Sequence, residues 1–179
     1  YTRGPRAVAP GCCAPQVLCE ATTPMYHLYD IDTDDGPVTM IGVLPPEIAL
    51  GHGLPSPAVV GTLPRGATEI TPETFAPNDE FSEFLGYVIS KHGARDPMLA
   101  DQARQQGDGW VFMVDLRVGE TDDEIETEDV LGAFRAEAGA VVDGSYRANP
   151  KHALLTERGL PVIDEWVYEK LVEELLALE

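Results

Sequence analysis

Residues 109–118 read GWVFMVDLRV, and this stretch carries the clearest strand pattern in the chain. Large apolar side chains occupy every second position: Trp110, Phe112, Val114, Leu116 and Val118. Because successive side chains of a strand point to opposite faces, the pattern predicts a strand with one well-buried face, the uniformly apolar set pointing inward. The alternate positions, from Val111 to Arg117, would point the other way.

Further strands are predicted on both sides of this stretch. Residues 130–136 and 140–146 are typical of a hairpin, with Glu137-Ala138-Gly139 as a three-residue loop whose glycine takes the left-handed conformation. Shorter strands are predicted at 26–30, 38–44 and 58–63. Seven prolines between positions 45 and 77 exclude a long helix there, although a short one is allowed after Pro46.

Four helices are predicted from periodicity and capping residues. Residues 78–92 place Phe81, Phe84, Leu85, Val88 and Ile89 on one face, and Asp96-Pro97 begins a second helix that ends at Gly107. A third is expected from Asn149-Pro150 to Gly159, and a fourth from Pro161 onward. No internal repeat is evident. We therefore predict an α+β fold, mainly an antiparallel sheet with three to four helices packed on one face, and not a doubly wound nucleotide-binding sheet.

The first 24 residues differ from the rest of the chain. They contain all three cysteines (Cys12, Cys13 and Cys19) and four prolines, and no helical or strand period persists there. We predict an irregular N-terminal tail over 1–24 and a single α+β domain over 25–179. An odd cysteine number does not make a disulfide framework, and paired zinc-ligand spacing is missing, so we expect free thiols in a reducing cytoplasm.

Charge excludes some classes of partner. The 179-residue chain has 31 acidic and 12 basic residues, a formal net charge of −19. Such a field repels phosphate backbones and anionic lipids, which argues against general nucleic-acid binding and membrane binding. The surplus acids serve either solubility, including adaptation to a salty cytoplasm, or contact with a basic partner.

The densest acidic run covers residues 120–129, between two predicted strands. Its seven acids are Glu120, Asp122, Asp123, Glu124, Glu126, Glu128 and Asp129. Such runs are usually solvated linkers because like charges repel each other. This run is anchored at both ends, however, so it is also a candidate docking loop for a basic protein surface.

A second acidic cluster precedes Gly36 and suggests hard-cation chemistry. Asp30, Asp32 and Asp34 alternate along the chain, and calcium or magnesium prefers such oxygen ligands. The EF-hand pattern fails, because Asp35 stands where glycine is required and Ile41 where a bidentate glutamate is required. The alternative is a plain acidic turn. No other cofactor is predicted.

Known catalytic motifs are missing from the sequence: it has no phosphate-binding glycine loop, no nucleophile elbow and no HExxH pair. Our leading hypothesis is a non-catalytic acidic interaction protein, such as an adaptor, inhibitor or immunity-type partner of a basic protein. The alternative is a small metal-assisted hydrolase using the Asp30–Asp35 cluster with His27. A third hypothesis is a purely structural subunit that forms a homodimer through the apolar stripe of the C-terminal helix, which includes Trp166.

Overall fold

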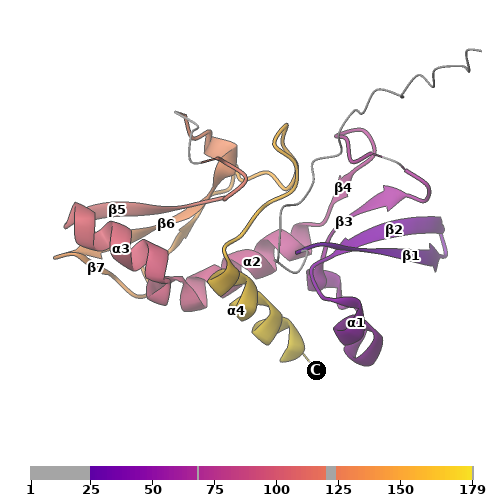
Figure 1. Ribbon diagram of the computed structural model, residues 1–179, viewed down its shortest axis with the longest axis horizontal. Coiled ribbons are helices and arrows are strands. Elements are labelled where there is room, and N and C mark those ends of the chain that lie inside the picture. Colours follow the sequence, from indigo (N-terminus) through magenta and orange to yellow (C-terminus); the bar gives the residue numbers. More distant parts are fainter. Residues whose placement is uncertain (1–24, 68, 120–123, 179) are drawn as a thin grey trace, which may run out of the picture.

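The computed structural model describes residues 25–67, 69–119 and 124–178. Within these residues the strands form two separate antiparallel sheets, accompanied by four α-helices. The predicted α+β fold is therefore confirmed, with its strands divided over two sheets. Figure 1 shows the sheets at opposite ends of the molecule with α2 between them. The predicted tail 1–24, with its three cysteines, lies outside the described residues.

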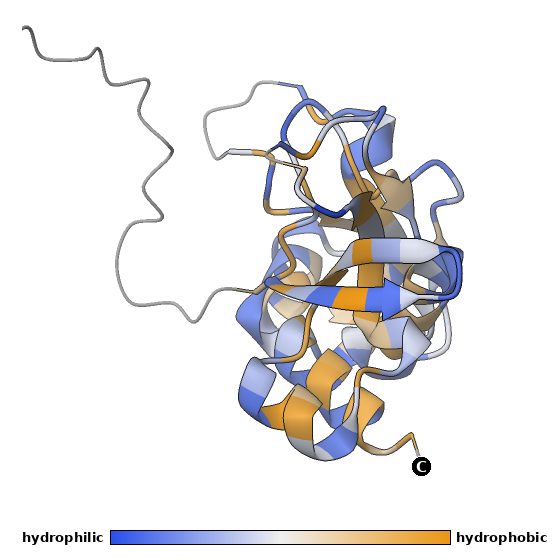
Figure 2. Ribbon diagram, turned by 90° about the vertical axis from the view of Figure 1, so that its right-hand side faces the viewer, coloured by the Kyte–Doolittle hydropathy of each residue, from blue (hydrophilic) through white to orange (hydrophobic). Residues whose placement is uncertain are grey.

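The first sheet has the strand order β1-β2-β3-β4, and the second has the order β5-β6-β7 with β8 also paired to β6. From His27 to Asp32, β1 alternates between half-buried and exposed residues, which is the expected period of a strand. Figure 2 turns the first sheet toward the viewer and shows both apolar and hydrophilic residues on its strands. The strands are β1 (His27–Thr33), β2 (Gly36–Gly42), β3 (Val59–Pro64), β4 (Ala76–Pro77), β5 (Gly109–Val114), β6 (Val130–Glu137), β7 (Ala140–Val141) and β8 (Arg147–Ala148).

The four helices begin at the expected kinds of residue. They are α1 (Pro46–His52), α2 (Asp79–His92), α3 (Pro97–Gln106) and α4 (Glu165–Leu176). Side chains of Asn78, Asp96 and Asp164 accept backbone N–H bonds at the starts of α2, α3 and α4. The predicted apolar face of α2 is buried in a hydrophobic cluster that also contains side chains of both sheets and α4.

α4 packs on α2 and bonds to the segment that follows β2. Glu174 accepts hydrogen bonds from Lys91 at 2.8 Å and lies 2.7 Å from Nε2 of His92, and these two bonds lower the pKa of its carboxyl. The Tyr168 hydroxyl donates to the carbonyl oxygen of Val43 at 2.8 Å. The last helix therefore joins elements from the first half of the chain.

The predicted buried face of β5 is wrong. Val111 and Met113 are buried, whereas Trp110 is 36% and Phe112 52% exposed. Most side chains on both faces of this strand are apolar, so the alternating sequence pattern does not show which face is buried. Packing selects it: Val111 stands opposite the fully buried Phe134 of β6 and joins it in the core.

Two helix predictions in the C-terminal part also need correction. Residues 149–159 form an irregular loop, because their backbone groups bond to β6 and to the turn before it: the N–H of Asn149 donates to the carbonyl of Leu131, and that of Ala153 to the carbonyl of Glu128. The last helix begins at Glu165 instead of Pro161. Residues 161–163 are not helical, and the carbonyl of Val162 accepts the N–H of Leu116 at 2.7 Å. Hydrogen bonds to distant segments have therefore prevented the helix starts that the local asparagine and proline residues predict.

The β6–β7 hairpin lies at the predicted position, but its turn is tighter and its second strand ends at Val141 instead of Tyr146. Its loop consists of two residues, Ala138 and Gly139, whose φ angles are +51° and +78°. Two positive φ values are typical of the type I′ turn that follows strand twist. Ala138 is the only described residue other than glycine with positive φ, and its N–H is held by a carboxylate oxygen of Asp108 at 2.7 Å.

The two sheets contain the same local arrangement, an internal repeat that the sequence does not reveal. In each, a bulged strand pairs with a strand preceded by a 3₁₀ turn, and a two-residue strand then pairs on its other side. β2, β3 and β4 correspond in this way to β5, β6 and β8. The matching residue pairs in the ladders are Gly61 with Pro77 and Gly132 with Ala148.

We call β2, β3 and β4 the first copy of the repeat, and β5, β6 and β8 the second copy. A glycine and an asparagine occur at equivalent positions in both copies, and their contacts explain why the arrangement recurs. Gly61 and Gly132 lie under an aromatic ring, where a Cβ atom would stand within 2.5 Å of Phe75 or Tyr146. Asn78 and Asn149 each donate two side-chain bonds of 2.6–2.8 Å to carbonyls at the start of the middle strand. Each asparagine therefore fastens the chain after the short strand to the 3₁₀ turn before the middle strand.

Candidate functional site

The copies differ most at a group of buried positions, and this difference identifies the candidate site. In the first copy the N–H of Val43 donates to the carbonyl of Ala58. In the second copy the N–H of Asp115 donates to the main-chain carbonyl of Asp129. Phe81 and His152 also correspond, since each N–H bonds to the asparagine three residues earlier at 3.2 Å. The apolar group Val43, Ala58 and Phe81 is thus replaced by Asp115, Asp129 and His152 on an equivalent backbone.

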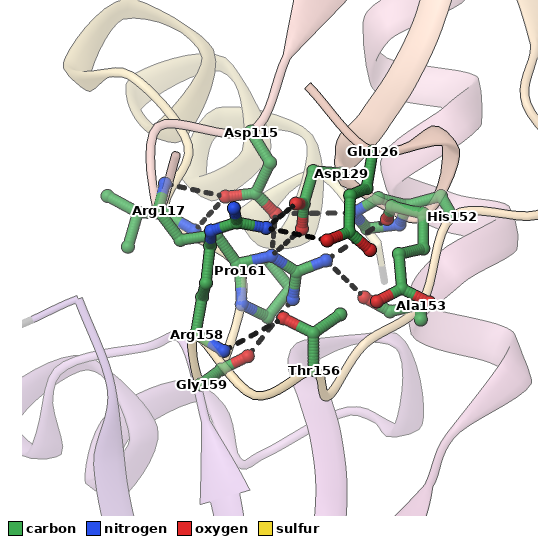
Figure 3. Close-up of polar contacts among 12 residues, drawn as sticks. Asp115, Arg117, Glu126, Asp129, His152, Ala153, Thr156, Arg158, Gly159 and Pro161 are labelled. Atoms are coloured by element: carbon green, nitrogen blue, oxygen red, sulfur yellow. Dashed lines mark hydrogen bonds and ion pairs between the residues drawn. The ribbon is translucent and has the colours of Figure 1, made fainter. Parts of the chain in front are cut away.

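Arg117 is the centre of this polar group, which Figure 3 shows. Its side chain is 1% exposed, and Nε donates to Oδ1 of Asp129 at 2.8 Å. The two terminal nitrogens donate to three carbonyl oxygens, those of Glu128, Ala153 and Gly159, at 2.7–3.1 Å. One guanidinium therefore connects the end of β5, the start of β6 and the irregular loop 149–163. We call these side chains the Arg117 cluster: Asp115, Arg117, Asp129, His152 and Arg158.

Asp115 is fully buried, and both of its carboxylate oxygens are bonded. Oδ1 accepts the N–H groups of Arg117 and Val162 at 3.0 and 2.7 Å. Oδ2 lies 3.2 Å from Nε2 of His152 and 3.4 Å from Nε of Arg117. The second buried carboxylate, Asp129, accepts from Arg158 at 2.7 Å as well as from Arg117. Two carboxylates are thus matched by two guanidiniums, as burial of charge requires.

Tyr26 connects the start of the described chain to the same region. Its hydroxyl donates a hydrogen bond to the carbonyl oxygen of Pro161. Burial, and secondarily the negative charge of Asp115, raise the pKa of this phenol far above its usual value, while Arg117 acts in the opposite direction. Tyr26 therefore stays protonated and serves as a hydrogen-bond donor.

The chemistry of the Arg117 cluster favours a structural role. A histidine–aspartate pair can serve as a general base when the histidine can reach a substrate proton. His152 is only 10% exposed in its side chain, however, and no residue of the cluster lines the hollow beside Trp110 or the hollow at the starts of α3 and α4. What the geometry does provide is a rigid support for the loop 149–163 and for the end of the acidic run at Asp129.

The predicted docking residues are distributed between surface and core. Glu124 and Glu126 are exposed and Glu128 is half-buried, while Glu120, Asp122 and Asp123 lie outside the described residues. Asp129 differs from them, because it is fully buried and bonded to Arg117 and Arg158. Its charge therefore serves the fold and is not available to a partner.

The predicted metal-binding aspartates lie on or next to β1. The carboxylate of Asp30 accepts the Thr39 hydroxyl at 2.6 Å, and that of Asp32 pairs with Arg65 at 2.9 Å. Asp34 is exposed in the turn to β2. Within the described ranges, no group of three or more His, Cys, Asp or Glu side chains is arranged to hold a metal ion. His27, proposed to act with them, has a buried Nε2 atom without a hydrogen-bond partner.

Carboxylates also meet in a shallow hollow of about 400 Å³ where the N-termini of α3 and α4 lie together. Burial, and next the nearby Asp164, raise the pKa of Asp96, although the N–H groups of Leu99 and Met98 oppose this. Both aspartates cap helices, and the other lining residues are Pro97, Met98, Glu165, Trp166 and Glu169. The raised pKa of Asp96 is therefore explained by the packing of two capped helix ends.

Comparison of the chain with protein-family models, curated proteins and solved structures finds no match. In the part of the chain that the structure describes, no helix is both long enough and apolar enough to cross a bilayer.

Proposed function

We propose that this chain is a non-catalytic acidic interaction protein that docks a basic protein surface. The observation that supports this most is the position of the exposed acids Glu124 and Glu126 directly before the Arg117 cluster. Because Asp129 is fixed from two sides, the segment 124–128 leaves the fold at a rigid point. Anchoring lowers the conformational entropy that an acidic segment would lose when a partner binds.

Charge supports the same proposal. A net charge of −19 attracts a basic partner over long range, and anchored carboxylates then give local complementarity. We also propose a reducing cytoplasm as its compartment, because the odd number and the spacing of the cysteines favour free thiols. The alternative of a metal-assisted hydrolase stays a hypothesis that no observation among the described residues favours, since Thr39 and Arg65 engage Asp30 and Asp32.

The test compares two double variants with the same net charge. Glu124→Gln with Glu126→Gln removes charge next to the cluster, and Glu73→Gln with Glu83→Gln removes it from other exposed sites. Association with a fluorescent octalysine peptide is measured by stopped flow at several salt concentrations. We expect the first double variant to associate several-fold more slowly than the second, with little change in dissociation. Equal association rates would show that only total charge matters and would refute the docking role.

A further inference from the structure

The outer face of the second sheet exposes aromatic side chains beside arginine. Trp110 and Phe112 of β5 point away from the core, and Cζ of Arg147 lies 4.8 Å from the centre of the Trp110 ring. Arg147 belongs to β8, which pairs with β6 on the side opposite to β5. The Arg147 side chain therefore reaches across β6, and Trp110, Phe112 and Arg147 form one continuous patch. Aromatic residues and arginine are the types most enriched at the energetic centres of protein interfaces.

β5 is also an edge strand in the described part of the chain, with β6 on one side only. The N–H and carbonyl of Arg135, opposite Trp110, bond to Ser145 and Val142 on the far side of β6. Trp110 and Arg135 are thus a non-hydrogen-bonded pair of the β5–β6 ladder. Because hydrogen-bonded and non-hydrogen-bonded pairs alternate along an antiparallel ladder, the N–H and carbonyl groups of Trp110 and Phe112 point to the free edge of β5. A side-chain amide of Gln106 bonds the Trp110 carbonyl at 3.0 Å, which leaves the groups of Phe112 open.

Beyond the end of β5, the chain turns and is bonded by a later segment, where the N–H of Leu116 donates to the carbonyl of Val162 at 2.7 Å. The main-chain groups of Phe112 stay open before this turn. The edge at Phe112 is therefore suited to strand addition, the mode in which main-chain bonds supply affinity and side-chain contacts supply selectivity.

The charge of the patch indicates what kind of segment fits. In a chain with 31 acids, Arg147 makes no ion pair with any residue that the structure describes, whereas Arg135 is paired with Glu137 at 3.0 Å. The guanidinium of Arg147 is held by the Trp110 ring with its N–H donors available. A carboxylate is the complementary partner for such a group.

We propose that the free edge of β5 and the patch Trp110–Phe112–Arg147 bind an extended acidic segment of a partner protein, which adds to the sheet as a strand. Its apolar side chains cover Phe112 and Trp110, and a carboxylate pairs with Arg147. This proposal does not depend on the acidic segment 124–128, which would contact a different, basic surface.

The test uses defined peptide probes. The chain has two tryptophans, so Trp166→Phe leaves Trp110 as the single tryptophan, whose emission is excited apart from that of the tyrosines. Acetylated heptapeptides of alternating valine and glutamate, or valine and lysine, are titrated against this protein. We expect the glutamate peptide to change Trp110 emission and to slow hydrogen exchange at the Phe112 amide. A peptide with proline at its central position should do neither, because it cannot donate to the edge.

A charge-reversal variant at Arg147 then distinguishes binding at this patch from attraction or repulsion by the overall charge of the protein. Arg147→Glu should weaken the glutamate peptide about fivefold and favour the lysine peptide, while Arg95→Glu, an equal charge change on another exposed arginine, should leave the preference unchanged. Arg147→Ala replaces the reversal if Arg147→Glu disturbs the circular dichroism spectrum. Equal binding of both peptides, or no protection at Phe112, would overturn the proposal. Protection that rises with protein concentration alone would identify a second copy as the occupant and overturn it as well.

Discussion

Removal of the Arg117 guanidinium should be among the most destabilising substitutions in this chain. Arg117→Met keeps the length of the side chain and removes its charge. It leaves the buried Asp129 with Arg158 alone and removes donors from three carbonyl oxygens. Breaking a buried ion pair by deleting one partner costs about 3–5 kcal/mol. That is a large part of the roughly 5–15 kcal/mol by which domains are stable.

The assay is equilibrium unfolding in urea, followed by circular dichroism, with Arg65→Met as the matched control. Arg65 also pairs with an aspartate at 2.9 Å, but both side chains are exposed, so its loss should cost at most about 1 kcal/mol. If Arg117→Met fell within about 0.5 kcal/mol of the control, the cluster would not support the fold as we argue.

The internal repeat supplies a second test of the same reasoning. Asp115→Val, Asp129→Ala and His152→Phe, combined with Arg117→Met, reproduce the apolar residues of the first copy. Because no charge then stays buried without a partner, this combination should recover part of the stability lost in the single variant. If it is less stable than Arg117→Met alone, buried charge is not the source of the loss.

Three further predictions concern the helix ends and the repeat. Asn78→Ala and Asn149→Ala should each cost about 1–3 kcal/mol in urea unfolding, because each substitution removes two donated bonds and one bond accepted from the N–H two residues later; a loss confined to one of the two variants would contradict their equivalent role in the repeat. The pKa of Asp96 is raised in the folded state, so wild type should lose stability as pH rises from the unfolded pKa of this carboxyl through its folded value. Asp96→Asn keeps a capping side chain without the charge and should therefore melt higher than wild type at pH 7 and equally at pH 3, which thermal scans at both pH values would check. Gly132→Ala should destabilise strongly, because its Cβ would lie 2.5 Å from the Tyr146 ring and 2.7 Å from a carbonyl oxygen; Gly86→Ala, in open space on α2, should instead stabilise by up to about 1 kcal/mol.

Local patterns identified most of the elements. The apolar face of α2 and the Asp96-Pro97 start of α3 are both set within one or two helical turns, so the sequence predicts them correctly. The face of β5 could not be assigned in this way. Trp110 and Val111 are both apolar, and packing against Phe134 of β6 decides which of them is buried.

The candidate site was harder to predict because its residues come from distant segments. Asp115 and Arg117 could have been noticed as charges at the alternate positions of a strongly apolar strand, where burial requires partners. Their partners at 128–129 and 152–162, however, follow from tertiary packing alone. The repeat was hidden for a similar reason: Gly132 and Asn149 match residues of the first copy, but Asp115 and His152 replace apolar residues at equivalent positions.

The bonds of Tyr26 and Tyr168 have a consequence for the order of events during synthesis. Tyr26 bonds to a carbonyl 135 residues later, and Val43 receives its bond from a tyrosine 125 residues later. At about 5–20 residues per second, a ribosome needs roughly 6–27 s to supply these partners. Tyr26 and Val43 therefore leave the ribosome well before Pro161 and Tyr168, and the bonds between these distant segments form only after residues 161 and 168 have been made.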